Sequence, residues 1–189
     1  MCGILAARGL SVFHHRHLNS LRRRGPDAVG YWSNPDVSLG HARLSIIGLD
    51  ERGTQPMENH RHVLAFNGEI YNFEEIRAKL LSCGVPCKSG TDTEVVLNGW
   101  TQWGADLLPR LTGFWAFVVY DKEQRTLTLV RDQLGVKPMY YWHARERTIA
   151  SSLLRTVLET SGETPELNYQ AISEYVRYQL TFGDATFFK

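Results

Sequence analysis

Short apolar runs separated by turn residues are the feature that most constrains how this chain folds. Each run has a length typical of a β-strand. They occur at residues 3–7, 29–32, 37–42, 63–67, 114–120 and 126–130. The last two are joined by residues 121–125, a spacing typical of a hairpin. The pattern predicts one or two predominantly antiparallel sheets.

Two amphipathic segments interrupt these runs and carry helix-start signals. Residues 72–83 begin with Asn72, a candidate N-cap, and residues 91–103 begin with Thr91 followed three residues later by Glu94, a capping-box pattern. Apolar side chains recur at helical spacing in both segments. We therefore expect two helices that lie on a sheet.

Charge and hydropathy limit the classes of partner. The 189 residues fit one domain and carry a formal net charge of +1, which provides no electrostatic basis for binding nucleic acid or an anionic membrane. The longest apolar or aromatic run, residues 114–120, is far shorter than the roughly 20 residues that span a bilayer, and the N-terminus lacks the pattern of a secretory signal. We expect a cytoplasmic protein, and a small neutral or zwitterionic ligand stays open.

The cysteines point to the N-terminus. Three cysteines are an odd number, so a disulfide framework is not expected. The three-residue gap between Cys83 and Cys87 fits neither the usual redox pair nor a zinc site, and we expect no bound metal. Loss of Met1, which the small Cys2 permits, leaves a first residue that carries both a thiol and a free α-amine.

Such a residue contains a nucleophile and a base. An α-amine titrates near ~7.8 and a thiol near ~8.5, so transfer of the proton from thiol to amine costs only about 1 kcal/mol. A cysteine at position 2 also arises by chance. Position alone therefore does not identify Cys2 as a nucleophile.

Seven motifs that occur together and in order decide whether Cys2 is a nucleophile or stands at position 2 by chance. They are MCGI at 1–4, RRGPD at 23–27, GHARLSII at 40–47, NGEIYN at 67–72, SGTDTE at 89–94, LTGFWAF at 111–117 and RDQLGVKP at 131–138. Together they resemble the class II glutamine amidotransferase domain of the asparagine synthetase type. None of the motifs would be specific alone.

The resemblance implies a fold and a reaction. The fold is the α+β sandwich of the N-terminal-nucleophile (Ntn) hydrolases, αββα, with two antiparallel β-sheets packed face to face and helices outside. The reaction is the hydrolysis of L-glutamine to L-glutamate and ammonia, which passes to an acceptor activated by an ATP-dependent synthetase domain. Residues 2–160 correspond to the glutaminase domain, and residues 161–189 to a linker and the start of a synthetase domain.

The catalytic residues that the resemblance implies are Cys2, Asn67 and Gly68. Cys2 would attack the amide carbon and form a thioester. The Asn67 side-chain amide and the Gly68 backbone N–H would hold the oxyanion, and loss of one such donor costs ~3 kcal/mol. An alternative for Asn67-Gly68 is a tight hairpin turn between two strands.

The substrate-binding residues that the resemblance implies match the charges of a free amino acid. Arg43 would bind the α-carboxylate, for which a planar fork of donors is well suited. Asp92 would bind the α-ammonium, although an acid in the first turn of a helix also stabilises the helix dipole without any ligand. Glu69 and the backbone at Ile46 and Ile47 would complete the pocket.

The acceptor of the ammonia is not determined by this sequence. The chain has no Ser-Gly-Gly-x-Asp-Ser loop for adenylate formation, so ATP and Mg are expected only in a synthetase domain, in cis or as a partner protein. Ser151-Ser152 stand where asparagine synthetases usually read Ser-Glu, in a region that faces the synthetase half in the family. A piece of a longer amidotransferase, a stand-alone glutaminase and a homodimer all stay open. The rival functions are a catalytically silent Ntn scaffold and an Ntn peptidase or acylase.

Overall fold

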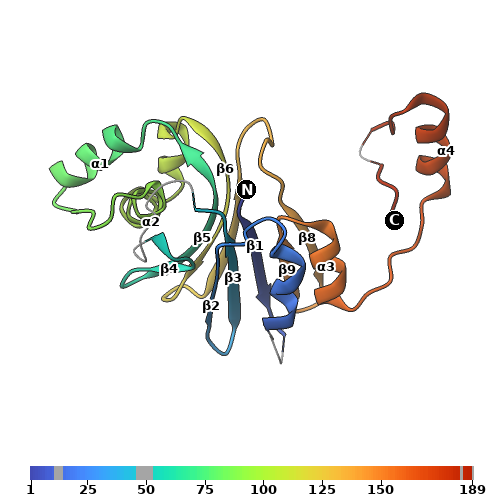
Figure 1. Cartoon of the computed structure of the whole chain (residues 1–189), viewed down its shortest axis with the longest axis horizontal. Coiled ribbons are helices and arrows are strands. Elements are labelled where there is room, and N and C mark those ends of the chain that lie inside the picture. The colour runs from blue at the N-terminus through green and yellow to red at the C-terminus, as the bar shows by residue number, and fades with distance from the viewer. Residues whose placement is uncertain (11–14, 46–52, 184, 189) are drawn as a thin grey trace.

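Two antiparallel sheets pack face to face in the computed structural model (Figure 1), which describes residues 1–10, 15–45, 53–183 and 185–188. The strand order is β2-β3-β1-β9-β8 in the first sheet and β4-β5-β6-β7 in the second. The strands are β1 (Gly3–Arg8), β2 (Ala28–Ser33), β3 (Val37–Arg43), β4 (Met57–Glu58), β5 (His62–Ile70), β6 (Gly113–Asp121), β7 (Thr126–Arg131), β8 (Tyr140–Ala144) and β9 (Arg147–Ser151).

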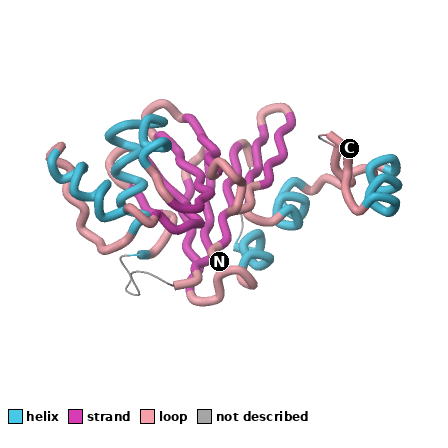
Figure 2. Tube along the Cα trace, turned by 90° about the horizontal axis from the view of Figure 1, so that it is seen from above, coloured by secondary structure: helices cyan, strands magenta, loops and turns pink. Residues whose placement is uncertain are grey.

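Helices cover the two outer faces of this sandwich (Figures 1 and 2). The α-helices are α1 (Phe73–Ser82), α2 (Asp92–Trp103), α3 (Leu154–Ser161) and α4 (Tyr169–Tyr178), and the 3₁₀ helices are η1 (His15–Leu21) and η3 (Gly104–Arg110). None of the helices in the described segments is both long and apolar enough to cross a membrane.

Three apolar layers hold the sandwich together. The layer between the sheets includes Ile4, Leu39, Val63, Ala65, Val118 and Tyr120. A second layer joins β5 and β6 to α1 and α2 and includes Leu64, Phe66, Ile76, Val96 and Phe117. A third joins β1 and β9 to η1 and α3 and includes Leu5, Leu18, Leu21, Ile149 and Val157. Neighbouring residues of β1 and of β5 thus serve different layers, as the two-residue period of a strand requires.

The helix starts differ in detail from the sequence prediction. Thr91 caps α2 as predicted, because its hydroxyl accepts a hydrogen bond from the backbone N–H of Glu94. Asn72 occupies the N-cap position of α1, but its side chain makes no capping bond. Its amide instead donates to the carbonyl of Arg110 and accepts from the N–H of Thr112, so Asn72 ties α1 to the start of β6.

Helix α4 lies apart from the sandwich in both ribbon views (Figures 1 and 2). The C-terminal residues contact this helix: the N–H of Asn168 donates to the carbonyl of Phe187, and the Tyr175 and Phe187 rings pack edge to face. Tyr169 and Val176 are 74% and 72% exposed. The segment therefore presents apolar side chains away from the sandwich.

Candidate functional site

The polar site lies at one end of the layer between the sheets. On β3, inward side chains change from Val37 and Leu39 to His41 and Arg43, because alternate residues share a face. On β5, the inward side chains likewise change from the apolar Ala65 to the polar Asn67 and Glu69. Both strands thus place their polar residues at the same end, next to the start of β1.

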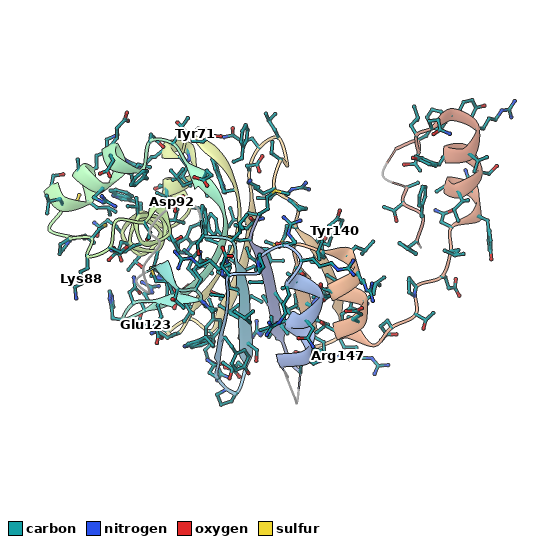
Figure 3. The ribbon with its side chains drawn as sticks, viewed as in Figure 1. Tyr71, Lys88, Asp92, Glu123, Tyr140 and Arg147 are labelled. Carbon is teal, nitrogen blue, oxygen red and sulfur yellow. The ribbon has the colours of Figure 1, made fainter. Side chains whose placement is uncertain are left out.

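One pocket brings together six of the predicted site residues. Its lining includes Cys2, Arg43, Asn67, Gly68, Glu69 and Asp92. These come from the start of β1, the end of β3, the C-terminal part of β5 and the first turn of α2, where Asp92 is labelled in Figure 3. Ile46 and Ile47 lie outside the described residues. Met1 and Lys137 also line this pocket.

The Cys2 thiol is half-buried and bonded to the backbone of Leu44. The Leu44 N–H points to the sulfur at 3.4 Å, and the sulfur lies 3.6 Å from the Leu44 carbonyl oxygen. With Met1 in place, burial is the main effect and raises the pKa of the thiol; the charge of Asp92 also raises it, while the Leu44 hydrogen bond, the Met1 amine and Arg43 lower it. Because burial is the largest effect, the thiol is protonated at neutral pH and needs a base to react.

Arg24, Ser151 and Ser152 fix the position of Cys2 through hydrogen bonds to the backbone of Cys2 and Ile4. The Arg24 Nε donates to the carbonyl of Cys2 at 2.9 Å. Ser151 and Ser152 are both fully buried and bond the backbone of Ile4. The Ser151 hydroxyl donates to the Ile4 carbonyl, and the Ile4 N–H donates to the Ser152 hydroxyl. Ser152 therefore does not face outward, and in this chain the two serines hold β1 against the end of β9.

Asn67 and Gly68 lie inside strand β5, so the hairpin-turn alternative is wrong. They pair with Ala116 and Trp115 in an uninterrupted antiparallel register. Asn67 is 2% exposed, and its Nδ2 has no hydrogen-bond partner among the described residues. A buried amide donor without a partner costs about 1–3 kcal/mol, which points to a ligand that completes it.

The outer edge of β5 is open beside Gly68. Strand β4 pairs with β5 only through Met57 and Glu58. Beyond β4, side chains accept hydrogen bonds from the N–H groups at this edge. The Phe66 N–H donates to the Gln55 Oε1 at 2.7 Å, and the Ile70 N–H donates to the Asp92 carboxylate at 3.2 Å. Alternation places the Gly68 N–H on the same edge between them, and Gly68 lines the pocket.

Gly68 has no room for a side chain. A Cβ there would lie 2.5 Å from the Phe114 carbonyl oxygen and 2.8 Å from the Cα of Trp115 on β6. Any larger residue would push β5 away from β6. Glycine at position 68 thus keeps β5 close to β6 and keeps the Gly68 N–H in place at the edge.

Opposite charges line the pocket. Arg43 is 8% exposed and Asp92 is 7% exposed. The pKa of Asp92 is raised to about 6, mainly by burial and also by the charge of Glu69, while hydrogen bonds from the Ile70 and Thr93 N–H groups lower it. Asp92 is therefore anionic at neutral pH and becomes neutral in mild acid.

Lys137 reaches the pocket from a loop that is tied down at both ends. The carboxylate of Asp132 accepts the N–H groups of Val136 and Lys137 at 2.9 and 3.0 Å. The Arg131 Nε donates to the Lys137 carbonyl at 2.8 Å. The sequence analysis missed Lys137, although it belongs to one of the seven motifs.

The arrangement is suited to acyl transfer on a small zwitterion. A thiol lies in one pocket with an unpartnered amide donor, which is the composition of a nucleophile beside an oxyanion hole. Two cations, Arg43 and Lys137, and two acids, Glu69 and Asp92, line the same pocket, so charges of both signs are available for the α-carboxylate and α-ammonium of a free amino acid.

Comparisons with known proteins identify related domains. A family model described as a glutamine amidotransferase domain matches residues 1–189. A putative glutamine-hydrolysing asparagine synthetase of Methanocaldococcus jannaschii is 33% identical over 178 residues, which cover 82% of this chain and 34% of the relative. Asparagine synthetase B of Escherichia coli is 37% identical over 155 residues, covering 79% of this chain and 28% of the relative. The chain thus spans about a third or less of the length of these relatives.

Solved structures confirm the fold. Glutamine phosphoribosylpyrophosphate amidotransferase of B. subtilis superposes with a TM-score of 0.73, covering 88% of this chain and 45% of that chain. Its sequence identity is 19%, so this likeness concerns the fold alone. The predicted αββα sandwich of two antiparallel sheets is confirmed.

Proposed function

Because the chain belongs to the glutamine amidotransferase domain family, we propose that it hydrolyses L-glutamine to L-glutamate and ammonia through a thioester on Cys2. The observation that carries this proposal is the buried Nδ2 of Asn67, which has no partner among the residues that the structure describes and lies in the pocket that also holds the Cys2 thiol. A silent scaffold would have no reason to keep an unsatisfied donor at this place.

The reaction begins with proton transfer within one residue. Once Met1 is removed, the free α-amine of Cys2 accepts the thiol proton, and the thiolate attacks the δ-carbon of glutamine. The carbonyl π electrons move to the oxygen, which the Asn67 amide and the Gly68 N–H stabilise. Collapse of this intermediate breaks the C–N bond, and the protonated amine gives its proton to the departing ammonia.

Hydrolysis of the thioester reverses the roles. The same amine takes a proton from a water molecule, the resulting hydroxide attacks the thioester carbonyl, and the C–S bond breaks with the thiolate as leaving group. The same oxyanion donors serve both steps. Glutamate then leaves with its new γ-carboxylate.

Selection of a free amino acid rests on the charges in the pocket. The Arg43 guanidinium binds the α-carboxylate, and Asp92 with Glu69 binds the α-ammonium. A peptide substrate lacks one or both of these charges. The pair Arg43 and Asp92 therefore favours glutamine over a peptidase or acylase substrate.

The pH dependence of kcat/KM tests the role of Asp92. Its pKa of about 6 means that the carboxylate is lost as pH falls through 6, so kcat/KM for glutamine should fall about tenfold per pH unit below that value. In Asp92→Asn, kcat/KM should be low at pH 8 and this inflection should disappear. Asp106→Asn, at an exposed carboxyl on η3, is the matched control. An inflection near 6 that survives in Asp92→Asn contradicts the assignment.

The wider activity follows from the relatives. We propose that the ammonia passes to an acceptor activated by a synthetase domain, in cis or on a partner, and that ATP and Mg bind there and not in residues 2–160. Residues 161–189, whose helix α4 carries exposed tyrosines, would belong with that domain. The proposed cytoplasmic location fits three cysteines without disulfide bonds.

Glutamate release distinguishes the three candidate functions. The purified chain, with loss of Met1 verified by intact mass, should convert L-glutamine to glutamate and leave N-acetyl-L-glutamine and glutaminyl peptides intact. Equal cleavage of the acetylated or peptide substrates would indicate an acylase or peptidase. A folded chain with free Cys2 that releases no glutamate, alone or joined to its synthetase domain, would indicate a scaffold. A slow rate in the isolated domain fits the proposal, because closure over substrate can require the partner domain.

A further inference from the structure

We propose that His41 and Gln55 are positioning residues that clamp the Phe66 peptide and thereby hold the Asn67 amide in the place where the oxyanion forms. This inference rests on the proposed glutaminase function. It assigns a role to two buried polar side chains that the reaction itself does not use.

Both backbone groups of Phe66 bond to side chains from other elements. The Phe66 N–H donates to the Gln55 Oε1 at 2.7 Å, and the Phe66 carbonyl lies 3.1 Å from the His41 Nε2. His41 is completely buried, Gln55 is 6% exposed and Phe66 is 2% exposed. Phe66 immediately precedes Asn67, so these bonds fix the peptide from which the Asn67 side chain projects.

The ending of β4 makes the clamp necessary. Met57 pairs with Leu64 in the β4–β5 ladder, and the same register continued by two residues places Gln55 opposite Phe66. Strand β4 does not extend that far, so the edge groups of Phe66 lack a backbone partner there. Side chains replace the missing strand, because buried backbone groups without partners are costly.

His41 serves as a hydrogen-bond donor. Its Nδ1 is buried without a partner in the described part of the chain, so the ring proton resides on Nε2, where the Phe66 carbonyl accepts it. Burial lowers the pKa of His41 to about 4, with the Phe66 carbonyl raising it and Arg43 lowering it. The ring is therefore a neutral donor throughout the pH range in which Asp92 is ionised.

The clamp joins the three elements that carry the proposed site. His41 lies two residues before Arg43 on β3, and the Gln55 amide donates to the Thr93 hydroxyl at 3.2 Å, next to Asp92 on α2. The hydrogen bonds from His41 and from Gln55 to the Phe66 backbone join these elements to β5. The network thus sets the Asn67 amide, at the δ-amide end of the substrate, relative to Arg43 and Asp92 at its α-carbon end.

Removing the His41 donor should lower kcat and leave substrate binding largely intact. In His41→Leu, we expect kcat for glutamine to fall by about 30-fold, because small displacements of catalytic groups cost up to ~100-fold, with KM within about threefold. His41→Gln restores an N–H donor and should recover most of the loss. Gln55→Leu should behave like His41→Leu and provides a second variant if the first does not fold.

A double-mutant cycle separates positioning from general structural damage. If His41 acts through Asn67, the substitution His41→Leu should cost less than about threefold in an Asn67→Ala background. His62→Leu is the control, since His62 is also buried and bonds Thr101 away from the pocket; it should lower stability without a selective fall in kcat. Equal factors for His41→Leu in both backgrounds, or a rise in KM alone, would overturn the proposal.

Nuclear magnetic resonance tests the clamp without turnover. The side-chain amide signal of Asn67 should shift in His41→Leu and Gln55→Leu but not in His62→Leu. An unmoved Asn67 signal would overturn the clamp even if glutamine is hydrolysed. Absence of glutamate release by wild type would instead count against the proposed function, and the Asn67 signal would still decide the positioning role.

Discussion

Replacing Cys2 by alanine should reduce glutamate release from glutamine by ~10⁴-fold or more, because removal of a covalent nucleophile leaves only binding and oxyanion stabilisation. The fold should persist, since within the described residues the thiol forms hydrogen bonds only with the backbone of Leu44. The measurement is enzyme-coupled glutamate detection, with circular dichroism to verify the fold.

Cys83→Ala is the matched control for this prediction. Cys83 is an exposed free cysteine at the end of α1, and its loss should leave the rate unchanged. Comparable loss of activity in both variants would indicate a general effect of thiol removal. Retained glutaminase activity in Cys2→Ala would contradict a thioester mechanism.

The second large effect is expected for Asn67→Ala. Loss of one oxyanion donor should lower kcat by about 10²- to 10³-fold, with KM within about threefold, because the donor acts mainly on the charge that forms in the transition state. The thermal midpoint should not fall much, since the substitution removes a buried amide whose Nδ2 has no partner among the described residues.

Asn59→Ala provides the contrasting control. The Asn59 amide donates to Thr101 at 2.8 Å and its carbonyl oxygen accepts the His62 N–H, so its loss should lower the thermal midpoint and leave kcat unchanged. If Asn67→Ala instead lowers the thermal midpoint and leaves kcat intact, Asn67 is a structural residue and the oxyanion assignment is wrong.

Much of the fold follows from sequence periodicity. The six predicted strands and the two predicted helices on the second sheet are present, because alternation and capping signals are local. Strands β4, β8 and β9 were not predicted. On the edge strand β8, Tyr141 is 70% exposed and Trp142 is partly buried, although an aromatic run of this kind is typical of core packing. Exposure of an edge strand depends on its neighbours, which a local pattern does not record.

The candidate site divides in the same way. Motifs located Cys2, Arg43, Asn67, Gly68, Glu69 and Asp92, which line one pocket. Asn-Gly by itself favours a turn, and only the pairing of β5 with β6 across these residues overrides that preference. The role of His41 and Gln55 was not predicted, although His41 belongs to one of the seven motifs, because that role depends on where β4 ends, a tertiary feature. Alternation along β3 was the one available clue, since it places His41 on the same face as Arg43.

Trapping the acyl-enzyme is the most direct test of the proposed thioester on Cys2. The purified chain should be mixed with L-glutamine, quenched in acid within one turnover, and analysed by intact mass and peptide mapping. The account predicts a species without Met1 that is heavier by one glutamyl group, attached to Cys2, and enriched at early times. Glutamate formation with the adduct at another residue, or undiminished glutamate formation by Cys2→Ala, would contradict it.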